Sequence, residues 1–190
     1  VMSDSAADVD ITSAEVAEAG GGSLQALRDN GDRGEAMDVM IAGVSILTAD
    51  LYAQGKFDGV LSLGGGGGTN IGTAAMRQLP VGIPKLMAST VASSDVRPYV
   101  DIKDITMMFN VGDLLGLNPI TRKMLANAAG AAHGMASSRV ALDVRADGKP
   151  VIGMTNLGVL TDGAMRALER FRAAGYEVIV FHAVGSGGRA

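Results

Sequence analysis

The sequence lacks cysteine and tryptophan altogether and has few aromatic residues of any kind. Without cysteine the chain can form no disulfide, no thiolate nucleophile and no cysteine-ligated metal site, and this absence fits a reducing compartment. Aromatic residues make up 4% of the 190 residues, whereas 47% are hydrophobic, so aliphatic side chains and 11 methionines must fill the core. The length allows one full domain, or one domain and part of another.

Basic patches and long apolar runs are also missing. The formal net charge is −4, which argues against a general binder of nucleic acid or of anionic membranes. No uninterrupted apolar segment approaches the roughly 20 residues of a membrane helix, and no signal peptide is recognisable. The composition therefore predicts a soluble, cytoplasmic protein. Because the chain begins with Val1 and stops just after a glycine-rich segment, we expect an internal piece of a longer protein.

Glycine is what the sequence has in excess, above all in one uninterrupted run. The apolar segment 59–63 leads into five glycines, 64–68, which are followed by Thr69 and Asn70. This pattern predicts a buried strand, a loop without side chains, and a helix that Thr69 or Asn70 caps and that ends near Gln78. Glycine carries a backbone-entropy penalty, so five in a row favour close approach of a ligand over a simple turn. Backbone N–H groups at a helix N-terminus suit a phosphate or a carboxylate.

The glycine run matches neither of the common nucleotide-binding fingerprints. A P-loop needs a lysine after its last glycine, and no lysine follows here. The dinucleotide pattern needs glycine or alanine where Thr69 stands. The residues therefore predict an anion site without identifying the anion.

Alternating helices and strands are predicted along the rest of the chain. Helical spacing and capping residues predict helices at 13–19, 32–54, 119–136 and 162–174. Short apolar segments predict strands at 85–88, 105–109, 151–155 and 178–181. The predicted fold class is α/β, with a Rossmann-like parallel sheet and flanking helices in residues 1–148 and the start of a second α/β subdomain in 149–190. In such sheets ligands bind at the carboxyl ends of the strands.

Polar side chains follow the second predicted strand. Ser89, Thr90, Ser93 and Asp95 lie where a buried strand would end, and their oxygens can bind phosphate, ribose or hydrated Mg²⁺. The same residue types are equally typical of turns and caps. Three aspartates that flank the third strand are expected to be solvated loop charges rather than an acid–base pair: Asp101, Asp104 and Asp113.

A second glycine-rich segment follows the last predicted strand. His182 ends that strand, where it could act as a general acid or base or contact a phosphate. Arg189 could bind a phosphate or carboxylate with its guanidinium fork. Gly185, Gly187 and Ala190 fit a relaxed dinucleotide spacing, but no helix follows within the chain to support it. Two histidines without cysteine make a zinc site unfavourable, and His133 is expected to be a packing or surface residue.

Motifs from most of the chain occur in a fixed order. They are the segments 32–37 (DRGEAM), 63–69 (LGGGGGT), 79–90 (LPVGIPKLMAST), 104–108 (DITMM), 116–118 (GLN), 125–131 (LANAAGA) and 181–189 (FHAVGSGGR). On these motifs the chain resembles the family of the tomato protein that confers resistance to tomato mosaic virus, which has many uncharacterised bacterial and fungal relatives. The resemblance implies an ATP-binding domain of two α/β subdomains, usually dimeric, that takes ATP with or without Mg²⁺.

The sequence also departs from that family's pattern. An early Asp-Thr-Lys strand segment is missing, and Asn156-Leu157 stands where relatives tend to have Met-Phe. Val184 and Ser186 stand where threonine is common. These differences affect the second glycine-rich segment more than the first.

The leading hypothesis is an ATP-binding protein of unknown native reaction. The predicted ligand contacts are Gly64, Gly65, Gly66, Gly67, Gly68, Thr69, Asn70, Ser89, Thr90, Ser93, Gly185, Ser186, Gly187, Gly188 and Arg189. One alternative is a metabolic enzyme that acts on a carboxylate or sugar phosphate, with His182 and Asp95 in acid–base roles. The other is a non-enzymatic, nucleotide-gated interaction module, closer to the plant relative, which binds a viral replication protein.

Overall fold

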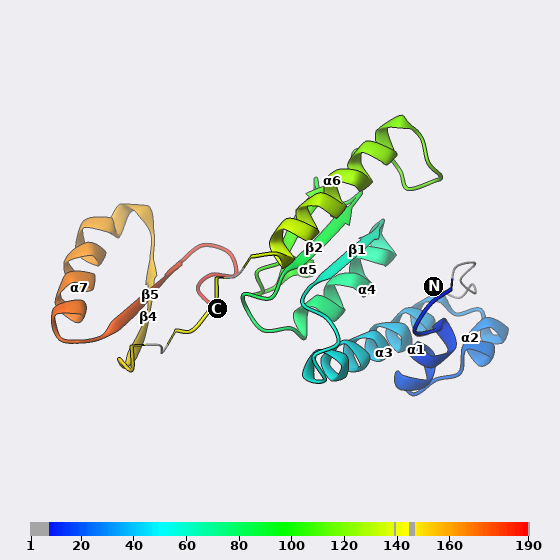
Figure 1. Ribbon diagram of the computed structural model, residues 1–190, viewed down its shortest axis with the longest axis horizontal. Coiled ribbons are helices and arrows are strands. Elements are labelled where there is room, and N and C mark those ends of the chain that lie inside the picture. The colour runs from blue at the N-terminus through cyan, green and yellow to red at the C-terminus, as the bar shows by residue number, and fades with distance from the viewer. Residues whose placement is uncertain (1–7, 139, 145–146, 190) are drawn as a thin grey trace. The chain divides into compact units, whose positions relative to one another are not determined.

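The computed structural model divides into two compact units and describes residues 8–138, 140–144 and 147–189. The first unit comprises the chain up to Val100 and residues 104–138, and the second comprises residues 101–103 and those from 139 onward. Each unit is an arrangement of helices and parallel strands, as Figure 1 shows. The boundary predicted between residues 148 and 149 follows residues 145 and 146, which lie outside the described residues.

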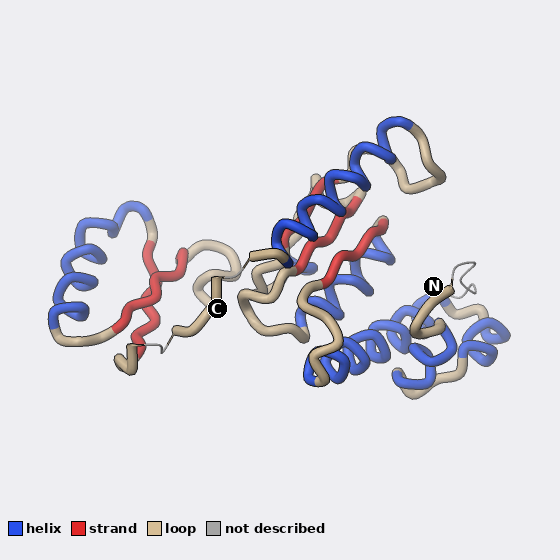
Figure 2. The backbone as a smooth tube through the Cα atoms, viewed as in Figure 1, coloured by secondary structure: helices blue, strands red, loops and turns tan. Residues whose placement is uncertain are grey.

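The first unit contains a three-stranded sheet and most of the helices (Figure 2). Its elements are α1 (Ser13–Ala19), α2 (Leu24–Asn30), α3 (Arg33–Ala53), β1 (Val60–Gly64), α4 (Gly66–Arg77), β2 (Lys85–Ser89), α5 (Arg97–Val100), β3 (Thr106–Phe109) and α6 (Pro119–Ala136). The strands are parallel in the order β1-β2-β3. The predicted α/β class with a parallel sheet and flanking helices is therefore confirmed.

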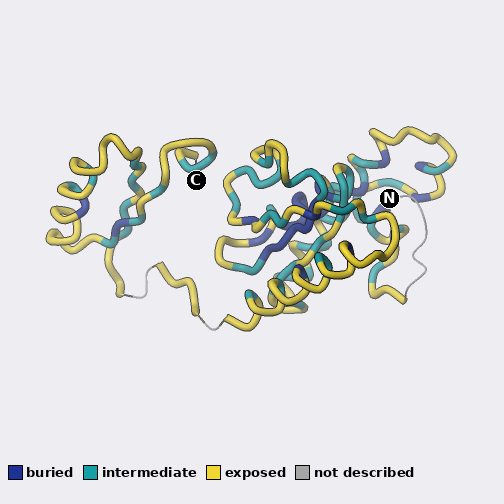
Figure 3. Tube along the Cα trace, turned by 90° about the horizontal axis from the view of Figure 1, so that it is seen from above, coloured by how far each residue is buried: buried dark blue, intermediate teal, exposed yellow. Residues whose placement is uncertain are grey.

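Helices cover both faces of this sheet. All five residues of β2 are buried, so the central strand forms the middle of the core (Figure 3). Met87 packs with Met76 of α4, whereas Leu86 and Ala88 pack with Ala128 of α6. Because alternate residues of a strand point to opposite faces, α4 and α6 lie on opposite sides of the sheet.

The helices before β1 pack around one apolar cluster, which Ile71 of α4 also joins. The side chains of Thr12 and Asp32 cap α1 and α3, so the helices predicted at 13–19 and 32–54 are confirmed. A Cβ at Gly43 would lie 1.8 Å from the carbonyl oxygen of Val16, so α1 and α3 cross with their backbones nearly touching. The short helix α2 was not predicted: it is as short as α1, but it lacks the side-chain cap that marks the start of α1.

One helix of the first unit has the length and composition of a membrane span. This is α3, with a mean hydropathy of 1.4, although no uninterrupted apolar segment was recognised in the sequence. Length and composition alone do not make a membrane span, because core helices of soluble proteins share both. In the structure α3 packs against α1 and α4, and Ala36, Met40 and Gly43 are its buried residues.

The second unit is a smaller parallel arrangement. It contains β4 (Val151–Asn156), the 3₁₀ turn η1 (Gly158–Leu160), α7 (Thr161–Ala173) and β5 (Glu177–His182). The two strands pair in parallel, from Val151 opposite Glu177 to Asn156 opposite His182. This agrees with the strands and helix predicted for residues 149–190, except for η1.

Candidate functional site

The parallel strands bring several predicted site residues to one edge of the three-stranded sheet. Gly64, Ser89 and Phe109 are the last residues of β1, β2 and β3, and they lie side by side in the register. The backbone N–H of Thr90 donates to the carbonyl of Gly64 at 3.1 Å, and that of Asn110 donates to the carbonyl of Ser89 at 3.0 Å. The first glycine run and the segment after β2 therefore lie together at the carboxyl edge.

The helix after β1 begins earlier than predicted. Gly65 is its N-cap and α4 starts at Gly66, so three glycines form the first helical turn and neither Thr69 nor Asn70 is a cap. The prediction of a five-residue glycine loop was wrong. The backbone N–H groups of a first turn need no intrahelical partner, so glycines are tolerated there and helix formation extends back to the strand.

The N-terminus of α4 carries no side-chain cap. By contrast, the Oδ1 atom of Asn118 accepts from the N–H groups of Ile120 and Thr121 at the start of α6, at 2.9 and 3.0 Å. The first N–H groups of α4 are thus left for a ligand or for water, together with the partial positive charge of the helix dipole.

Packing explains some of the five glycines but not all of them. A Cβ at Gly64 would lie 2.7 Å from the Cα of Gly68, and a Cβ at Gly68 would lie 3.3 Å from the carbonyl oxygen of Leu63. A Cβ at Gly66 meets nothing within 4 Å, and the nearest atom at Gly67 is 3.8 Å away. A side chain at either position fits the fold, so the absence of one has no internal steric reason.

A guanidinium group lies close to these open glycines. One terminal nitrogen of Arg33, the first residue of α3, is 3.9 Å from where a Cβ of Gly67 would be. No hydrogen bond or ion pair of the Arg33 side chain occurs within the described ranges. Arg33 belongs to the DRGEAM motif but was not predicted as a ligand contact. Helical periodicity accounted for the segment that contains Arg33 without indicating a ligand contact. Only the packing of α3 on α4 places Arg33 beside Gly67.

Thr69 and Ser89, two of the predicted ligand contacts, hydrogen-bond to each other. The hydroxyl of Thr69 contacts that of Ser89 at 2.7 Å and donates to the carbonyl of Gly65 at 2.8 Å. Both side chains are completely buried. The contact between these buried hydroxyls therefore joins the start of α4 to the end of β2 and holds the helix start in place.

The remaining predicted contacts of the first unit lie at different depths. Asn70 and Ser93 are exposed, and Thr90 is half-buried. The Thr90 hydroxyl lies 3.4 Å from where a Cβ of Gly65 would be, so it borders the N-terminus of α4. Of these three residues, Thr90 is the one that the described contacts place beside the open glycines.

Asn110, which follows β3, was not predicted and has the most unusual environment at this edge. It is 2% exposed, and neither its side-chain oxygen nor its side-chain nitrogen has a hydrogen-bond partner within the described part of the chain. A buried amide without partners costs about 1–3 kcal/mol for each unsatisfied group. Buried polar groups are nearly always satisfied, so Asn110 indicates a ligand or an ordered water. Its sequence context, one asparagine after an apolar strand, gave no such signal.

The catalytic candidate Asp95 is tied to a neighbour. Its carboxylate accepts from the side chain of Arg97 at 2.7 and 2.8 Å, and both groups are exposed. Hydrogen bonds from the Arg97 side chain and backbone, with the guanidinium charge, lower the pKa of Asp95 to about 2. At neutral pH this carboxylate is therefore ionised and has no proton to give as a general acid.

The second glycine-rich segment lies in the second unit and has a different structure. Residues 183–189 form bends and turns after β5, and His182 is exposed at the strand end. A Cβ at Gly187 would lie 2.0 Å from the carbonyl oxygen of His182, so packing of the turn requires this glycine. Arg189 donates to the carboxylate of Asp101 at 3.0 Å. Ser186 and Gly188 belong to the same turn, and Ala190 lies outside the described residues.

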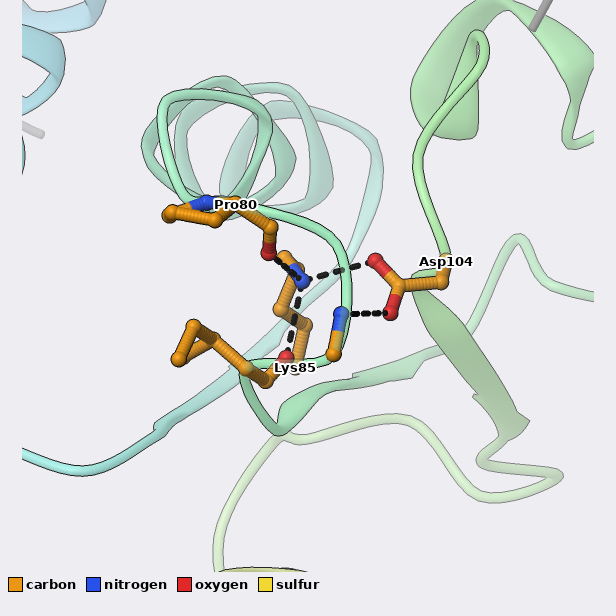
Figure 4. Close-up of polar contacts among 5 residues, drawn as sticks. Pro80, Lys85 and Asp104 are labelled. Atoms are coloured by element: carbon orange, nitrogen blue, oxygen red, sulfur yellow. Dashed lines mark hydrogen bonds and ion pairs between the residues drawn. The ribbon is translucent and has the colours of Figure 1, made fainter. Parts of the chain in front are cut away.

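An ion pair between a buried lysine and an exposed aspartate closes the opposite, amino edge of the three-stranded sheet (Figure 4). The ammonium group of Lys85, which is completely buried, donates to the carbonyls of Pro80 and Ile83 and to the carboxylate of Asp104, all at 2.7–2.8 Å. The other carboxylate oxygen accepts from the N–H of Gly82 at 2.7 Å. Asp104 is an exposed loop residue, as predicted, but the prediction missed its ion pair with a buried lysine that the sequence suggested only as a strand residue.

The charge state of Asp104 follows from these contacts. Burial raises the pKa of Asp104, but the hydrogen bonds from Lys85 and Gly82 and the charge of Lys85 outweigh burial, so this pKa lies below its ordinary value. Asp104 is therefore ionised at neutral pH, and its contacts with Lys85 and Gly82 give it a structural role. A shallow cavity of about 230 Å³ lies at the same edge, and exposed His133 of α6 lines it.

Comparison with known proteins gives matches along nearly the whole chain. Residues 1–141 match the N-terminal domain of an uncharacterised protein family (UPF0261), and residues 149–190 match its C-terminal domain. A UPF0261 protein of Clostridium tetani is 49% identical over 176 residues, which is 93% of this chain and 43% of that protein. UPF0261 protein RA0729 of Rhizobium meliloti is 45% identical over 182 residues, 96% of this chain and 44% of that protein.

Tomato proteins are also similar. The ToMV resistance protein Tm-1(GCR237) of Solanum lycopersicum is 37% identical over 161 residues, which is 83% of this chain and 21% of that protein. The resemblance inferred from the motifs is thereby confirmed. The chain spans less than half the length of the bacterial relatives it matches and about a fifth of the tomato protein.

Proposed function

The chain belongs to the uncharacterised UPF0261 family, and on that premise we propose that it binds ATP, with the phosphates held at the N-terminus of α4. The observation that carries the proposal is an uncapped helix start built from glycines that packing does not require. Open N–H groups and the helix dipole favour an anion at this place. The choice of ATP among possible anions rests on the resemblance stated above.

The charges and polar groups around the helix start support the same ligand. Arg33 can bind phosphate oxygens with its guanidinium fork, and Thr90 can donate a hydroxyl hydrogen bond. Mg²⁺ would arrive with the ATP phosphates, since no group of three or more His, Cys, Asp or Glu placed to hold a metal occurs among the described residues. The chain's own contribution is thus to bind and orient the phosphates.

Substitution at Gly66 tests the proposal most directly. Gly66→Asp adds a negative charge where it favours the helix but repels a phosphate, and Gly66→Asn adds nearly the same shape without charge. No atom within 4 Å obstructs either side chain at its Cβ. We expect calorimetric titration with ATP, with and without Mg²⁺, to show at least tenfold weaker binding for the Asp variant than for the Asn variant.

A control and a contrary result complete this test. Gly163→Asp places the same charge in the first turn of α7, where a Cβ also meets nothing, and should leave ATP binding unchanged. Equal affinities for Gly66→Asp, Gly66→Asn and the wild type would show that the helix start is only a turn. Titrations with ADP and inorganic phosphate show whether the site needs the nucleotide or takes any phosphate.

A further inference from the structure

The unsatisfied amide of Asn110 lies at the same sheet edge as the open helix start, but not next to it. Ser89 of β2 lies between them, since it pairs with Gly64 on one side and Phe109 on the other. Neighbouring strands are about 4.8 Å apart, so the ends of β1 and β3 are separated by roughly 10 Å. A single phosphate at the start of α4 does not reach Asn110, whereas a larger phosphate ester does.

The chemistry of an amide restricts what can satisfy it. The side chain of Asn110 offers two N–H donors and one acceptor oxygen, and all of them lack partners within the described residues. An ionised phosphate accepts hydrogen bonds but does not donate them, so it would leave the amide oxygen unsatisfied. A hydroxyl group both donates and accepts, and the hydroxyls of a sugar phosphate extend the ligand several ångströms beyond its phosphate.

We propose that Asn110 binds a sugar hydroxyl of a phosphate ester whose phosphate lies at the N-terminus of α4. This inference rests on the proposed function, because it uses the same anion site. The shared ligand chemistry is a hydroxylated sugar with a phosphate, which is supplied either by the ribose of a nucleotide or by a free sugar phosphate. Asn110 then makes the site discriminate between such esters and inorganic phosphates.

The segment that follows Asn110 is largely exposed. Both amide atoms are shielded from water, whereas Val111, Leu115 and Leu117 in the connection to α6 are strongly exposed. Gly116 in this connection has a φ of +79°, a conformation that glycine adopts without strain. Because the amide is shielded from water, the proposal requires the chain around it to move when a hydroxyl binds, and this exposed connection is the segment that we expect to move.

The test is the selectivity of an Asn110→Leu variant. Leucine has a similar volume and removes both unsatisfied polar atoms, so the variant is expected to be at least as stable as the wild type in urea unfolding. Affinities for ATP, 2′,3′-dideoxy-ATP, inorganic triphosphate and ribose 5-phosphate are measured for both proteins by calorimetry. We expect about tenfold weaker binding of ATP by the variant and unchanged binding of triphosphate.

The ligand series separates the two sources of the hydroxyl. If the wild type binds ATP more tightly than the dideoxy analogue and Asn110→Leu loses this difference, the hydroxyl belongs to a nucleotide ribose. If Asn110→Leu instead weakens only the binding of ribose 5-phosphate, the hydroxyl belongs to a free sugar phosphate. Gln78→Leu, a polar-to-apolar change at the far end of α4, is the matched control and should alter no affinity.

Three outcomes overturn the inference, and they are distinguishable from failure of the proposed function. Equal weakening of ATP and triphosphate by Asn110→Leu means that Asn110 does not contact the sugar. Lower stability with unchanged affinities means that an ordered water satisfies the amide. If wild type binds triphosphate but Asn110→Leu leaves every affinity unchanged, the phosphate site stands and only the hydroxyl contact is lost. No binding of any phosphate by the wild type would overturn the proposed function itself.

Discussion

The two edges of the three-stranded sheet differ in whether their polar groups have hydrogen-bond partners. At the amino edge the buried ammonium of Lys85 has three acceptors, and both oxygens of Asp104 have donors. At the carboxyl edge Asn110 has no partner among the described residues, and α4 begins without a side-chain cap. Because buried polar groups cost free energy unless they are paired, we assign a structural role to the closed edge and propose that the open edge binds the ligand.

The largest effect is expected at the closed edge. Asp104→Asn leaves the completely buried ammonium of Lys85 without its counter-ion, which should destabilise the first unit by about 3 kcal/mol. Lys85→Met should cost less, because the carboxylate that it leaves is 39% exposed and water can solvate it. Urea unfolding measures both variants. A smaller loss for Asp104→Asn than for Lys85→Met would contradict this account, and ATP affinity serves as the control that should not change.

A smaller loss of stability is expected when a glycine that packing requires at the open edge is replaced. Gly64→Ala places a Cβ 2.7 Å from the Cα of Gly68, and such overpacking costs about 1–3 kcal/mol. Gly66→Ala meets no atom within 4 Å and should be neutral or slightly stabilising. Thermal unfolding of the two variants compares them directly. Equal melting temperatures would mean that the division of the run into packing glycines and open glycines is incorrect.

The positive charge of Arg33 is expected to contribute to ATP binding at the open edge. Arg33→Gln should weaken ATP binding about tenfold, about 1.4 kcal/mol, because a charge-assisted contact to phosphate is lost. Lys56→Gln removes the same charge from an exposed position after α3 and should leave binding unchanged. Calorimetry at two salt concentrations measures both variants. Equal effects of the two substitutions would indicate general attraction by positive charge rather than contact at Gly67.

The smallest expected effect is the pH dependence of the closed edge. The pKa of Asp104 is lower in the folded protein than its ordinary value of 3.8, so its contribution to stability is present above that value and is lost as the pH falls through the lowered pKa. The stability difference between the wild type and Lys85→Met should therefore shrink below about pH 4. Urea unfolding at pH 7, 4 and 3 measures it, and a difference that stays constant across these values would exclude the ion pair as its source.

Local sequence patterns were sufficient to predict most of the secondary structure. The capping residues Asp32 and Asn118 and the apolar spacing after them place α3 and α6 within one or two residues. The pattern failed at α4, where composition indicated a loop through Gly68. There the hydroxyl contact of Thr69 with Ser89 and the close packing of Gly72 on Ser62 hold the helix against the sheet from its first turn. Those contacts join residues far apart in sequence, and spacing along the chain does not reveal them.

The sequence by itself determined the alternation of strands and helices, the family and the place of the first glycine run at a strand end, because these depend on local propensity and residue order. Only the tertiary structure decided which polar residues are paired and which are not. Lys85 and Asp104 are 19 residues apart, and their pairing depends on the register of β2 beside β3. The isolation of Asn110 and the approach of Arg33 to Gly67 likewise arise from packing in three dimensions, which determines how far each polar group is removed from water and what it meets there.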